Sequence, residues 1–518
     1  IITADNSGLG ATVGASVGVV TYFGDATNMT GVASSIFPLV YGPGIGSTDQ
    51  AASTDITTTW NYPLQAGSGT ITIRTGGVEG TIVDQFVVGS SSSITISERT
   101  LTLNPAADLA EGTEHFVVYP AGAIKSTSGQ KENNQLVTSF TTEIIEEQLW
   151  FWGRNQSGEF GINNTTTYSS PVQVPGMTWN RIISGGGAPS NSLASKRDGT
   201  LWAWGRNNEG ELGQNDRTYY SSPVQIPGTT WTKAISAGQR QMAAIKTDNT
   251  LYTWGRNPSG ELGHNNRTQY SSPVQIPGTT WAAIASYSYN TMATKTDGTF
   301  WSWGYSYRGQ LGHNQGGAIR YSSPTQIPGT TWPITFGKMA IDSTASAIKT
   351  DGTMWVWGQN DHGQLGLNVH ASPGNAGTSS PVQLPGTTWR SVCHIQDGIL
   401  ASKTDGTLWA WGRGDEQNGQ LGQNSQISYS SPVQIPGTTW SGVVGGGIRY
   451  AVATKTDGTL WVWGDNGEGM LGLNDRTKYS SPVQIGSSTG WSTTVGEQKI
   501  ANNNTNTQKM SGGILYIG

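Results

Sequence analysis

Residues 457–464 read Asp-Gly-Thr-Leu-Trp-Val-Trp-Gly, and this stretch decides the fold. The Asp-Gly pair favours the positive φ values of a two-residue hairpin turn. After the turn, successive side chains of a strand alternate between two faces, so Trp461 and Trp463 share one face. Leu460 and Val462 share the other. Because both faces are apolar, the strand predicts a small sheet that packs between two neighbouring sheets of a repeating array.

The same stretch recurs along the chain, together with a Ser-Ser-Pro motif and a Gly-x-x-Gly motif. The prolines of the seven Ser-Ser-Pro motifs lie 50–57 residues apart, at Pro171, Pro223, Pro273, Pro324, Pro381, Pro432 and Pro482. A period near 50 residues with several short strands per unit is typical of propeller blades. Such blades close into a ring, which removes open sheet edges. The sequence predicts an all-β chain that contains a seven-bladed β-propeller.

Twenty of the 21 tryptophans lie in this repeat array. An aromatic side chain buries roughly 150–250 Å², so indoles at repeated positions would dominate the contacts between blades. The second indole of each repeated strand is predicted as structural blade core: Trp152, Trp204, Trp254, Trp303, Trp357, Trp411 and Trp463. The segment Leu515-Tyr516-Ile517-Gly518 resembles a degraded copy of the strand, which predicts that the first and last strands share one blade. An eight-bladed ring and an open array are the alternatives.

The chain divides into three segments by composition and pattern. Residues 1–36 are dominated by Gly, Ala, Ser and Thr and are predicted to be an irregular leader or attachment segment. Residues 37–144 alternate apolar and polar side chains, with turn residues about every 8–12 positions, which is typical of a β-sandwich. Residues 145–518 hold the repeats. The predicted order is leader, Ig-like β-sandwich and propeller.

The repeat array resembles the regulator of chromosome condensation repeat family of seven-bladed β-propellers, in stretches such as residues 352–358 (Gly-Thr-Met-Trp-Val-Trp-Gly) and 363–366 (Gly-Gln-Leu-Gly). The resemblance implies the fold and not nucleotide exchange on a GTPase, because the loop surfaces for that activity have no match here. Residues 101–105 and 109–113 resemble bacterial Ig-like domains of surface-layer proteins, which act as spacers or stalks. Residues 24–31 resemble segments of virion appendage proteins of marine tailed phages.

Composition and charge disfavour several classes of function. Charged residues make up 12% of the chain, about half the usual ~25%. Residues 1–147 hold 14 acidic and 4 basic side chains, and residues 148–518 hold 20 acidic and 25 basic side chains. Neither part has the dense run of Lys and Arg that is typical of nucleic-acid binding. Cys393 is the one cysteine, and the six histidines lack metal-ligand spacing, so no disulfide, metal or cofactor is predicted. No membrane span is predicted, because no run of 18 apolar residues exists.

The most prominent polar feature is the loop that follows each Trp-Gly pair. Arg and Asn recur at its first two positions, and repetition places them on one rim of the ring. They would form either solvated turns or a shallow surface for acidic glycans or an anionic protein. The predicted binding rim comprises Arg154, Asn155, Arg206, Asn207, Arg256, Asn257, Tyr305 and Arg413. Two inserted loops, residues 315–320 and 369–377, break the symmetry and are expected to set specificity.

No catalytic constellation stands out, so the chain is predicted not to be an enzyme. The preferred interpretation is an extracellular structural and adhesive protein of a virion or cell surface, with an Ig-like stalk and a propeller that binds glycan or protein. Its partners would be other virion or surface proteins, host glycans or host surface proteins, and homo-oligomers are left open. The alternative is a regulatory propeller that controls an enzyme or a GTPase. A hydrolase or lyase is disfavoured, because acidic residues mostly occupy the repeated Asp-Gly turns and the Gly-Glu-Leu-Gly motif.

Overall fold

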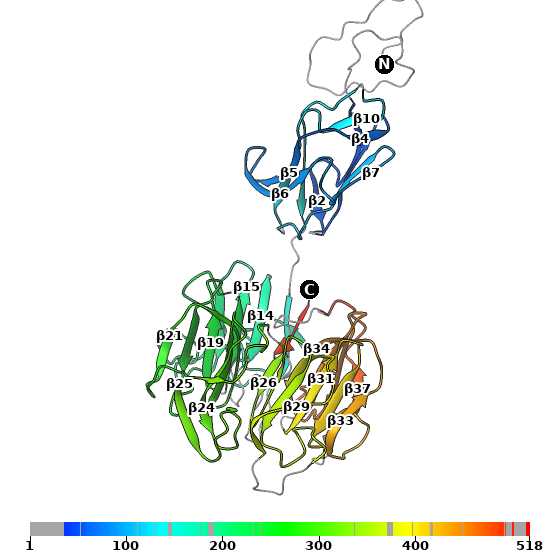
Figure 1. Ribbon diagram of the computed structural model, residues 1–518. Helices are drawn as coiled ribbons and strands as arrows, with labels where there is room; N and C mark the ends of the chain where they lie inside the picture. Colours follow the sequence, from blue (N-terminus) through cyan, green and yellow to red (C-terminus); the bar gives the residue numbers. More distant parts are fainter. Residues whose placement is uncertain are drawn as a thin grey trace, which may run out of the picture. The chain divides into compact units, whose positions relative to one another are not determined.

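The computed structural model describes residues 36–142 except 52, 111 and 130, residues 514–517, and most of residues 148–501. The gaps in the last range are 177, 185–190, 232, 239, 336, 370–376, 396, 415–417, 448, 492 and 494–499. The chain forms two compact units that divide between Ile145 and Glu146. All elements of the described part are β-strands, which confirms the predicted all-β class (Figure 1). Nearly all of the predicted leader, with its phage-like segment, lies outside the described residues.

The first unit is a sandwich of two antiparallel-rich sheets. One sheet has the strand order β1 (Pro38–Gly42), β3 (Ile56–Trp60), β8 (Thr100–Leu103) and β7 (Ile94–Ser97). The other has the order β2 (Ser47–Gln50), β11 (Leu136–Thr142), β9 (Glu114–Tyr119), β5 (Thr70–Thr75) and β6 (Thr81–Val87). A short ladder joins β10 (Ile124–Ser126) to β4 (Leu64–Ala66). The inward side chains form one core around Trp60, Ile71 and Phe86, as the period-two pattern predicts.

The second unit consists of seven four-stranded antiparallel sheets. From the inner to the outer strand, the first four are β38 (Ile500–Ala501), β39 (Ile514–Ile517), β12 (Gln148–Gly153), β13 (Tyr168–Gln173); β14 (Trp179–Ser184), β15 (Asn191–Lys196), β16 (Leu201–Gly205), β17 (Tyr220–Ile226); β18 (Ala234–Ala237), β19 (Gln241–Ile245), β20 (Leu251–Gly255), β21 (Tyr270–Ile276); and β22 (Trp281–Tyr287), β23 (Asn290–Lys295), β24 (Phe300–Ser306), β25 (Ile319–Ile327).

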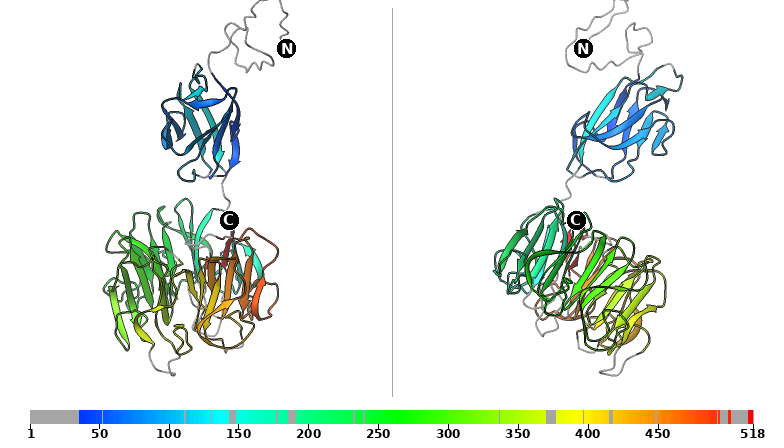
Figure 2. Two further views of the ribbon diagram at one scale, coloured as in Figure 1. Left: turned by 45° about the vertical axis from the view of Figure 1, so that its right-hand side comes forward. Right: turned by 60° about the vertical axis from the view of Figure 1, so that its left-hand side comes forward.

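The other three sheets follow the same order: β26 (Met339–Ile341), β27 (Thr344–Ile348), β28 (Met354–Gly358), β29 (Thr378–Leu384); β30 (Trp389–His394), β31 (Gly398–Lys403), β32 (Leu408–Gly412), β33 (Tyr429–Ile435); and β34 (Trp440–Gly446), β35 (Tyr450–Lys455), β36 (Leu460–Gly464), β37 (Tyr479–Gln484). Figure 2 shows these sheets side by side around one unit. Each is one blade of a propeller.

The ring is closed by strands from both ends of the repeat array. β39 pairs antiparallel with β12, so one blade contains β12 and β13 together with the C-terminal strands β38 and β39. The inner strand of this blade, β38, contacts both β34 and β14, the inner strands of the blades on its two sides. The first and last strands therefore share one blade, as the degraded C-terminal motif predicts.

A repeated hydrogen bond joins each blade to the one before it. The second indole of each Trp-x-Trp or Tyr-x-Trp strand is buried, and its Nε1–H donates to a backbone carbonyl of the Gly-x-x-Gly loop in the preceding blade. The N···O distances are 2.7–3.0 Å in the pairs Trp152–Met470, Trp204–Glu159, Trp254–Glu211, Trp303–Glu261, Trp357–Gln310, Trp411–Gln364 and Trp463–Gln420. We call this contact the indole latch. The pair Trp152–Met470 links the first blade to the last.

The glycines of the Gly-x-x-Gly motif leave space for the next blade. A Cβ on Gly263 would lie 2.8 Å from the Nε1 of Trp303, and one on Gly260 would lie 2.5 Å from the Cα of Ser322. Both glycines also have positive φ values, which L-residues rarely adopt. The Ser322 carbonyl accepts a 2.6 Å hydrogen bond from the Asn265 amide of the preceding blade. The Gly-x-x-Gly and Ser-Ser-Pro motifs are therefore two sides of one contact between blades.

The two indoles of a Trp-x-Trp strand are not equivalent, although the sequence pattern places them on one face. The first is half-buried, and in the strand that contains Trp301 its Nε1–H donates to Thr299 of the same blade, 2.9 Å away. A lysine also lies over it: the Lys295 Nζ is 4.3 Å from the Trp301 ring centroid and 4.9 Å from that of Trp281. Five sister blades repeat this arrangement through Lys196, Lys246, Lys349, Lys403 and Lys455. The first indole therefore stabilises its own blade.

Each Gly-Glu-Leu-Gly loop buries its acidic side chain. The Oε2 of Glu261 accepts a hydrogen bond from the Ser259 amide at 2.7 Å. Burial raises the pKa of Glu261 to about 7, against the opposing effects of these backbone hydrogen bonds and of Arg256 and Arg320. Gln310 makes the same bond to the Arg308 amide at 2.8 Å in the next blade. The bond requires an acceptor oxygen and not a charge, so these glutamates have a structural role, as the sequence predicts.

The first prediction concerns the indole latch. Replacing Trp303 by Phe removes the hydrogen bond between the blades, so that the Thr291 hydroxyl is the remaining side-chain donor to the Glu261 carbonyl. The smaller ring also leaves a space between the two sheets, so the substitution should lower the free energy of unfolding by about 2–4 kcal/mol. The control Trp301→Phe removes only a bond within the blade and should cost less than about 1 kcal/mol. Equilibrium denaturation in urea measures both. Equal losses for the two variants would show that the latch adds nothing beyond packing.

The second prediction concerns Glu261. Its pKa is higher in the folded chain than in the unfolded one, so the carboxylate costs stability that grows as pH rises from its ordinary value of 4.5 to about 7. Glu261→Gln should therefore leave the melting temperature unchanged at pH 4 and raise stability at pH 8 by on the order of 1–3 kcal/mol. Thermal unfolding at both pH values measures this, with the less buried Glu468→Gln as control. A variant that is less stable than the parent at pH 8 would contradict the prediction.

Candidate functional site

The propeller has two faces with different roles. The hairpin face carries the Asp-Gly turns, such as the turn from β15 to β16. The loop face carries the longer connections from the inner to the second strand and from the third to the outer strand, such as residues 206–219 between β16 and β17. The predicted binding rim lies on the loop face. Since the blades repeat the same hairpins and lysine contacts on the hairpin face, the loop face is where the blades differ most.

The recurring asparagines of the predicted rim are fully buried, so this part of the rim prediction is wrong. The Oδ1 of Asn207 accepts a 2.9 Å hydrogen bond from the Leu212 amide, and its Nδ2 donates to the Asp216 carbonyl at 3.2 Å. Asn155 and Asn257 make the equivalent bonds in their loops. These side chains replace backbone partners inside each loop. Asparagine recurs there because it holds the loop together, and it is not available to a partner.

The recurring arginines are also less available than predicted. Arg154 and Arg206 are buried, and Arg154 donates to Gln156 of its own loop. Arg256 is half-buried, with its guanidinium carbon 4.9 Å from the ring centroid of Tyr289. Arg413 is half-buried and forms an ion pair with Asp397 at 3.3 Å. The prediction of one continuous Arg/Asn rim is therefore corrected: Arg256, Tyr305 and Arg413 reach the surface at separate blades.

One loop departs from the repeated pattern in both sequence and structure. Residues 305–308 read Tyr-Ser-Tyr-Arg, whereas three other blades begin this loop with Arg-Asn and two more carry Asn at its second position. β24 and β25 are longer here than their counterparts, and Tyr305 pairs with Arg320 in the extended ladder. The Arg320 guanidinium carbon lies 4.4 Å from the Tyr305 ring centroid, and the Tyr305 and Tyr307 rings stack at 5.8 Å. The longer strands therefore place Tyr305 and Tyr307 on the loop face, and the end of the inserted loop at 315–320 forms the start of β25.

A pocket of about 280 Å³ lies beside this extended hairpin. We call it the tyrosine pocket. Its lining comes from three connections on the loop face: the turn between β22 and β23, the start of the β24–β25 loop, and the turn between β26 and β27. The lining residues are Tyr287, Ser288, Tyr289, Asn290, Tyr305, Tyr307, Gln310, Asp342 and Ser343. Tyr307 is 40% exposed and Asp342 is 5% exposed, so an aromatic rim leads to a buried acid.

Asp342 is the most perturbed acid of the pocket. Burial and, to a lesser extent, the negative charge of Asp397 raise its pKa to about 7, and a hydrogen bond from the Ser343 amide opposes the shift. That amide lies 2.6 Å from Oδ1. Burial and the nearby Asp342 also raise the pKa of Tyr307 to about 12 and that of Tyr287 well above 10.0. Both tyrosines therefore keep their hydroxyl protons at neutral pH.

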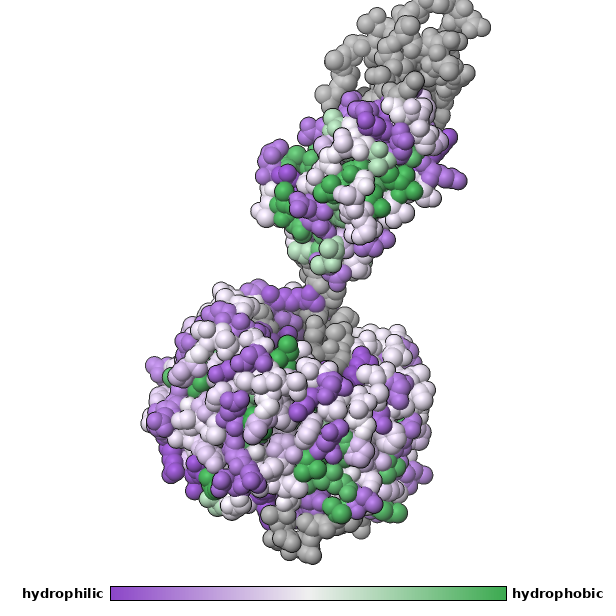
Figure 3. All heavy atoms as spheres, in the orientation of Figure 1, coloured by the Kyte–Doolittle hydropathy of each residue, from purple (hydrophilic) through white to green (hydrophobic). Residues whose placement is uncertain are grey.

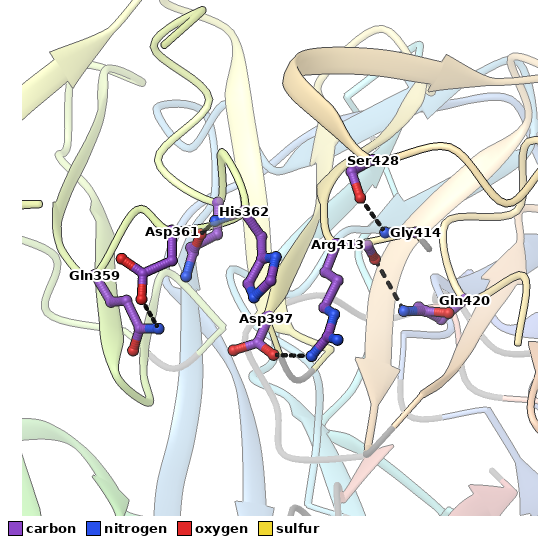
Figure 4. A network of polar contacts seen from close by, with 9 residues as sticks. Gln359, Asp361, His362, Asp397, Arg413, Gly414, Gln420 and Ser428 are labelled. Carbon is purple, nitrogen blue, oxygen red and sulfur yellow. Dashed lines mark hydrogen bonds and ion pairs between the residues drawn. The ribbon is translucent and has the colours of Figure 1, made fainter. Parts of the chain in front are cut away.

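Two ion pairs lie next to the tyrosine pocket. Figure 4 shows the Asp397 carboxylate facing the Arg413 guanidinium, and the amide of Gln359 bonded to Asp361 at 2.9 Å. Arg308, from the extended hairpin, is 3.9 Å from the same Asp361 carboxylate. Of the predicted rim residues, Arg413 takes part in this polar region, where it pairs with an acid of its own blade.

The described residues contain no group of three or more His, Cys, Asp or Glu side chains arranged to hold a metal ion. Burial lowers the pKa of His394 to about 3, and its Nε2 lies 3.0 Å from the Ser346 hydroxyl inside the ring. Burial also raises the pKa of Cys393, which is fully buried beside it. Both groups are therefore uncharged and packed at neutral pH. The part of the chain that the structure describes has no helix long and apolar enough to cross a membrane.

Sequence reasoning identified Tyr305 but missed Tyr307, Tyr287 and Asp342. The break in the Arg-Asn pattern at 305–308 was the available signal, since a repeat protein keeps the residues that its fold requires at each copy. Asp342 gave no such signal, because its partners come from other blades. The second inserted loop, residues 369–377, lies largely outside the described residues.

Two protein-family models match this chain, one in each of its two compact units. The regulator of chromosome condensation (RCC1) repeat matches residues 198–245, 248–293, 351–398, 405–447 and 457–495, and the bacterial Ig-like domain matches residues 40–142. The stretch between 293 and 351 is not matched, and it contains Tyr305, Tyr307 and Asp342. Four other lining residues of the tyrosine pocket, residues 287–290, lie in the matched stretch 248–293.

Several known proteins resemble the propeller. The ultraviolet-B receptor UVR8 of Arabidopsis thaliana is 28% identical over 323 residues, which is 61% of this chain and 60% of the receptor. Human RCC2 is 34% identical over 82 residues, 16% of each chain. The chain thus spans less than two thirds of these relatives.

Two solved structures share the fold at 17% identity. Prp20p of Saccharomyces cerevisiae has a TM-score of 0.60, covering 73% of this chain and 92% of Prp20p. Human WBSCR16 has a TM-score of 0.57, covering 72% and 98%. With the two family matches and the closed ring of seven sheets, these likenesses show that the chain contains a bacterial Ig-like domain followed by a β-propeller of regulator of chromosome condensation repeats.

Proposed function

We propose that the protein is a non-catalytic binding protein whose propeller presents its loop face to a partner. The observation that carries this proposal is the division of residues on that face. Positions that recur in every blade are buried and hold the loops, whereas the departures from the repeat gather at the tyrosine pocket and its ion pairs. A rigid ring with one such region is suited to recognition, because its binding side chains are held in place before contact.

The surface of the propeller favours polar recognition. In Figure 3 the visible face of the second unit is mostly hydrophilic or neutral, and hydrophobic residues occur in small separate groups. A broad apolar interface is typical of obligate partners, whereas a polar surface with a few aromatic anchors is typical of transient ones. Tyr307, with its exposed ring beside Arg308, has the character of such an anchor.

The finer proposal is an adhesive role outside the cell. The Ig-like domain would act as a spacer, and the propeller would bind a host glycan or surface protein for a virion or a cell. Supporting this are the pairing of a bacterial Ig-like domain with the propeller, the low content of charge, and buried acids whose environment suits packing better than catalysis. Other structural proteins of the same appendage would be its second class of partner.

A second candidate function is regulation of another protein. The yeast propeller Prp20p has binding properties toward Gsp1p and histones. By analogy of fold alone, the loop face of this chain would bind and control an enzyme or a GTPase. This candidate differs from adhesion in its partner, which would be a soluble protein instead of a surface component.

The third prediction separates the candidates. The full chain, immobilised, should retain glycans on an array or proteins from detergent-extracted host surface material, and Tyr307→Ala with Arg308→Ala should reduce that binding at least tenfold. The control Tyr219→Ala removes a ring of similar exposure, 42%, from another blade and should bind normally. Retention of a soluble protein alone would favour the regulatory role. No retention from either source, or equal binding by the loop-face variant, would contradict the proposal.

A further inference from the structure

The acids around the tyrosine pocket differ in whether a cation accompanies them. Asp397 pairs with Arg413 at 3.3 Å, and Asp361 pairs with Arg308 at 3.9 Å. Glu261 is stabilised by Arg256 and Arg320. Among the described residues, Asp342 has no basic partner, and the groups acting on it are the negative Asp397 and the Ser343 amide. It is therefore the one acid of this pocket whose charge is uncompensated.

Two acceptor atoms of the pocket also lack a hydrogen-bond donor among the described residues. The Oδ1 of Asp342 accepts from the Ser343 amide, while no described residue donates to its Oδ2. Asn290 is 4% exposed, lines the pocket, and its Oδ1 has no hydrogen-bond partner among the described residues. A buried acceptor such as the Asn290 Oδ1 loses its hydrogen bonds to water without gaining others, which costs stability. A ligand that supplies donors and positive charge would remove this cost.

We propose that the tyrosine pocket binds a primary alkylammonium group, such as the end of a lysine side chain presented by a partner. This inference rests on the proposed function and names the chemistry that the loop face recognises. An ammonium carries three donors on one atom, and the Asp342 Oδ2, the Asn290 Oδ1 and the Tyr287 hydroxyl are the oxygens that can accept them. The aromatic rings at the entrance attract a cation and cover the alkyl stem.

The pocket fits an ammonium better than the two nearest alternatives. A guanidinium binds a carboxylate through two parallel hydrogen bonds, and Asp342 has only one unbonded oxygen because the Ser343 amide occupies the other. A neutral sugar would stack on an open aromatic face, but Arg320 lies over Tyr305 and Arg256 lies over Tyr289. A neutral sugar also brings no positive charge to compensate that of Asp342.

Binding should depend on pH through Asp342. The groups that face it are Asp397 with its partner Arg413, Tyr287, and Tyr307 with the Arg308–Asp361 pair beside it. The tyrosines stay protonated between pH 6 and 8. Because the imidazole of His362 also lies near Asp397 in Figure 4, the Asp342→Asn variant described below is needed to assign a pH dependence to Asp342. Because only the carboxylate attracts a cation, affinity should rise roughly tenfold from pH 6 to pH 8.

The test uses the full chain and small probes, so it does not depend on knowing the partner. Nα-acetyl-lysine methylamide should bind with a Kd on the order of millimolar, measured by saturation-transfer NMR or calorimetry. The norleucine analogue, which lacks the ammonium, and the arginine analogue should bind at least about tenfold more weakly. n-Butylamine distinguishes the ammonium from the peptide frame: binding as tight as that of the lysine probe assigns recognition to the ammonium alone.

Two variants test the residues. Asp342→Asn keeps the shape and removes the charge, so it should abolish both the binding of the lysine probe and its pH dependence. Tyr307→Ala tests the same pocket without changing a buried acid, and Tyr219→Ala is the control for a lost surface ring. Equal binding of the lysine and norleucine probes, or undiminished binding by Asp342→Asn, would overturn the inference. If the immobilised protein retains a partner but the probes do not bind, this inference is wrong and the proposed function stands. If the probes bind but no partner is retained, this inference stands and the proposed function is wrong.

Discussion

The propeller depends on a hydrogen bond between an indole N–H and a backbone carbonyl of the neighbouring blade. Tryptophan is suited to this position because its large ring fills the space between two sheets while its one donor reaches across the interface. The bond also gives a donor to a buried carbonyl, which at two junctions accepts a second bond from a hydroxyl, that of Ser192 or Thr291. Repeating the bond at each of the seven junctions fixes the spacing of neighbouring sheets, and the junction of Trp152 with Met470 makes the ring complete.

Several residues that resemble functional groups follow from this constraint. The glycines of the accepting loop give the next indole room, the asparagines hold that loop, and its Glu or Gln side chains bond to their own backbone. Since these positions recur for structural reasons, their recurrence carries no information about a ligand. Information about a ligand comes from the blade where Tyr305 and Ser306 replace the usual Arg and Asn and the loop gains a longer hairpin.

The architecture could be predicted from the sequence because it depends on local patterns of residues. The Asp-Gly turns, the alternation of Trp461 and Trp463 with aliphatic residues, and the degraded strand at 515–518 each depend on neighbours in the chain. The binding rim could not be predicted in the same way. A recurring Arg-Asn pair indicates that these side chains have the same environment in each blade. It does not show whether that environment is solvent or the interior of a loop. Asn207 lies in the interior of its loop. Asp342 and Tyr287 come together from different blades, and no local pattern reports that approach.

The position of β12 has a mechanical consequence. Chain that precedes the propeller joins it at Gln148, the first residue of β12, and this strand lies between β13 and β39 with antiparallel pairing on both sides. A pull on the chain before Gln148, resisted by a partner held on the loop face where β12 ends, would run along β12 and load the hydrogen bonds of both ladders together in shear. The strand that closes the ring is then also the strand through which tension enters the propeller.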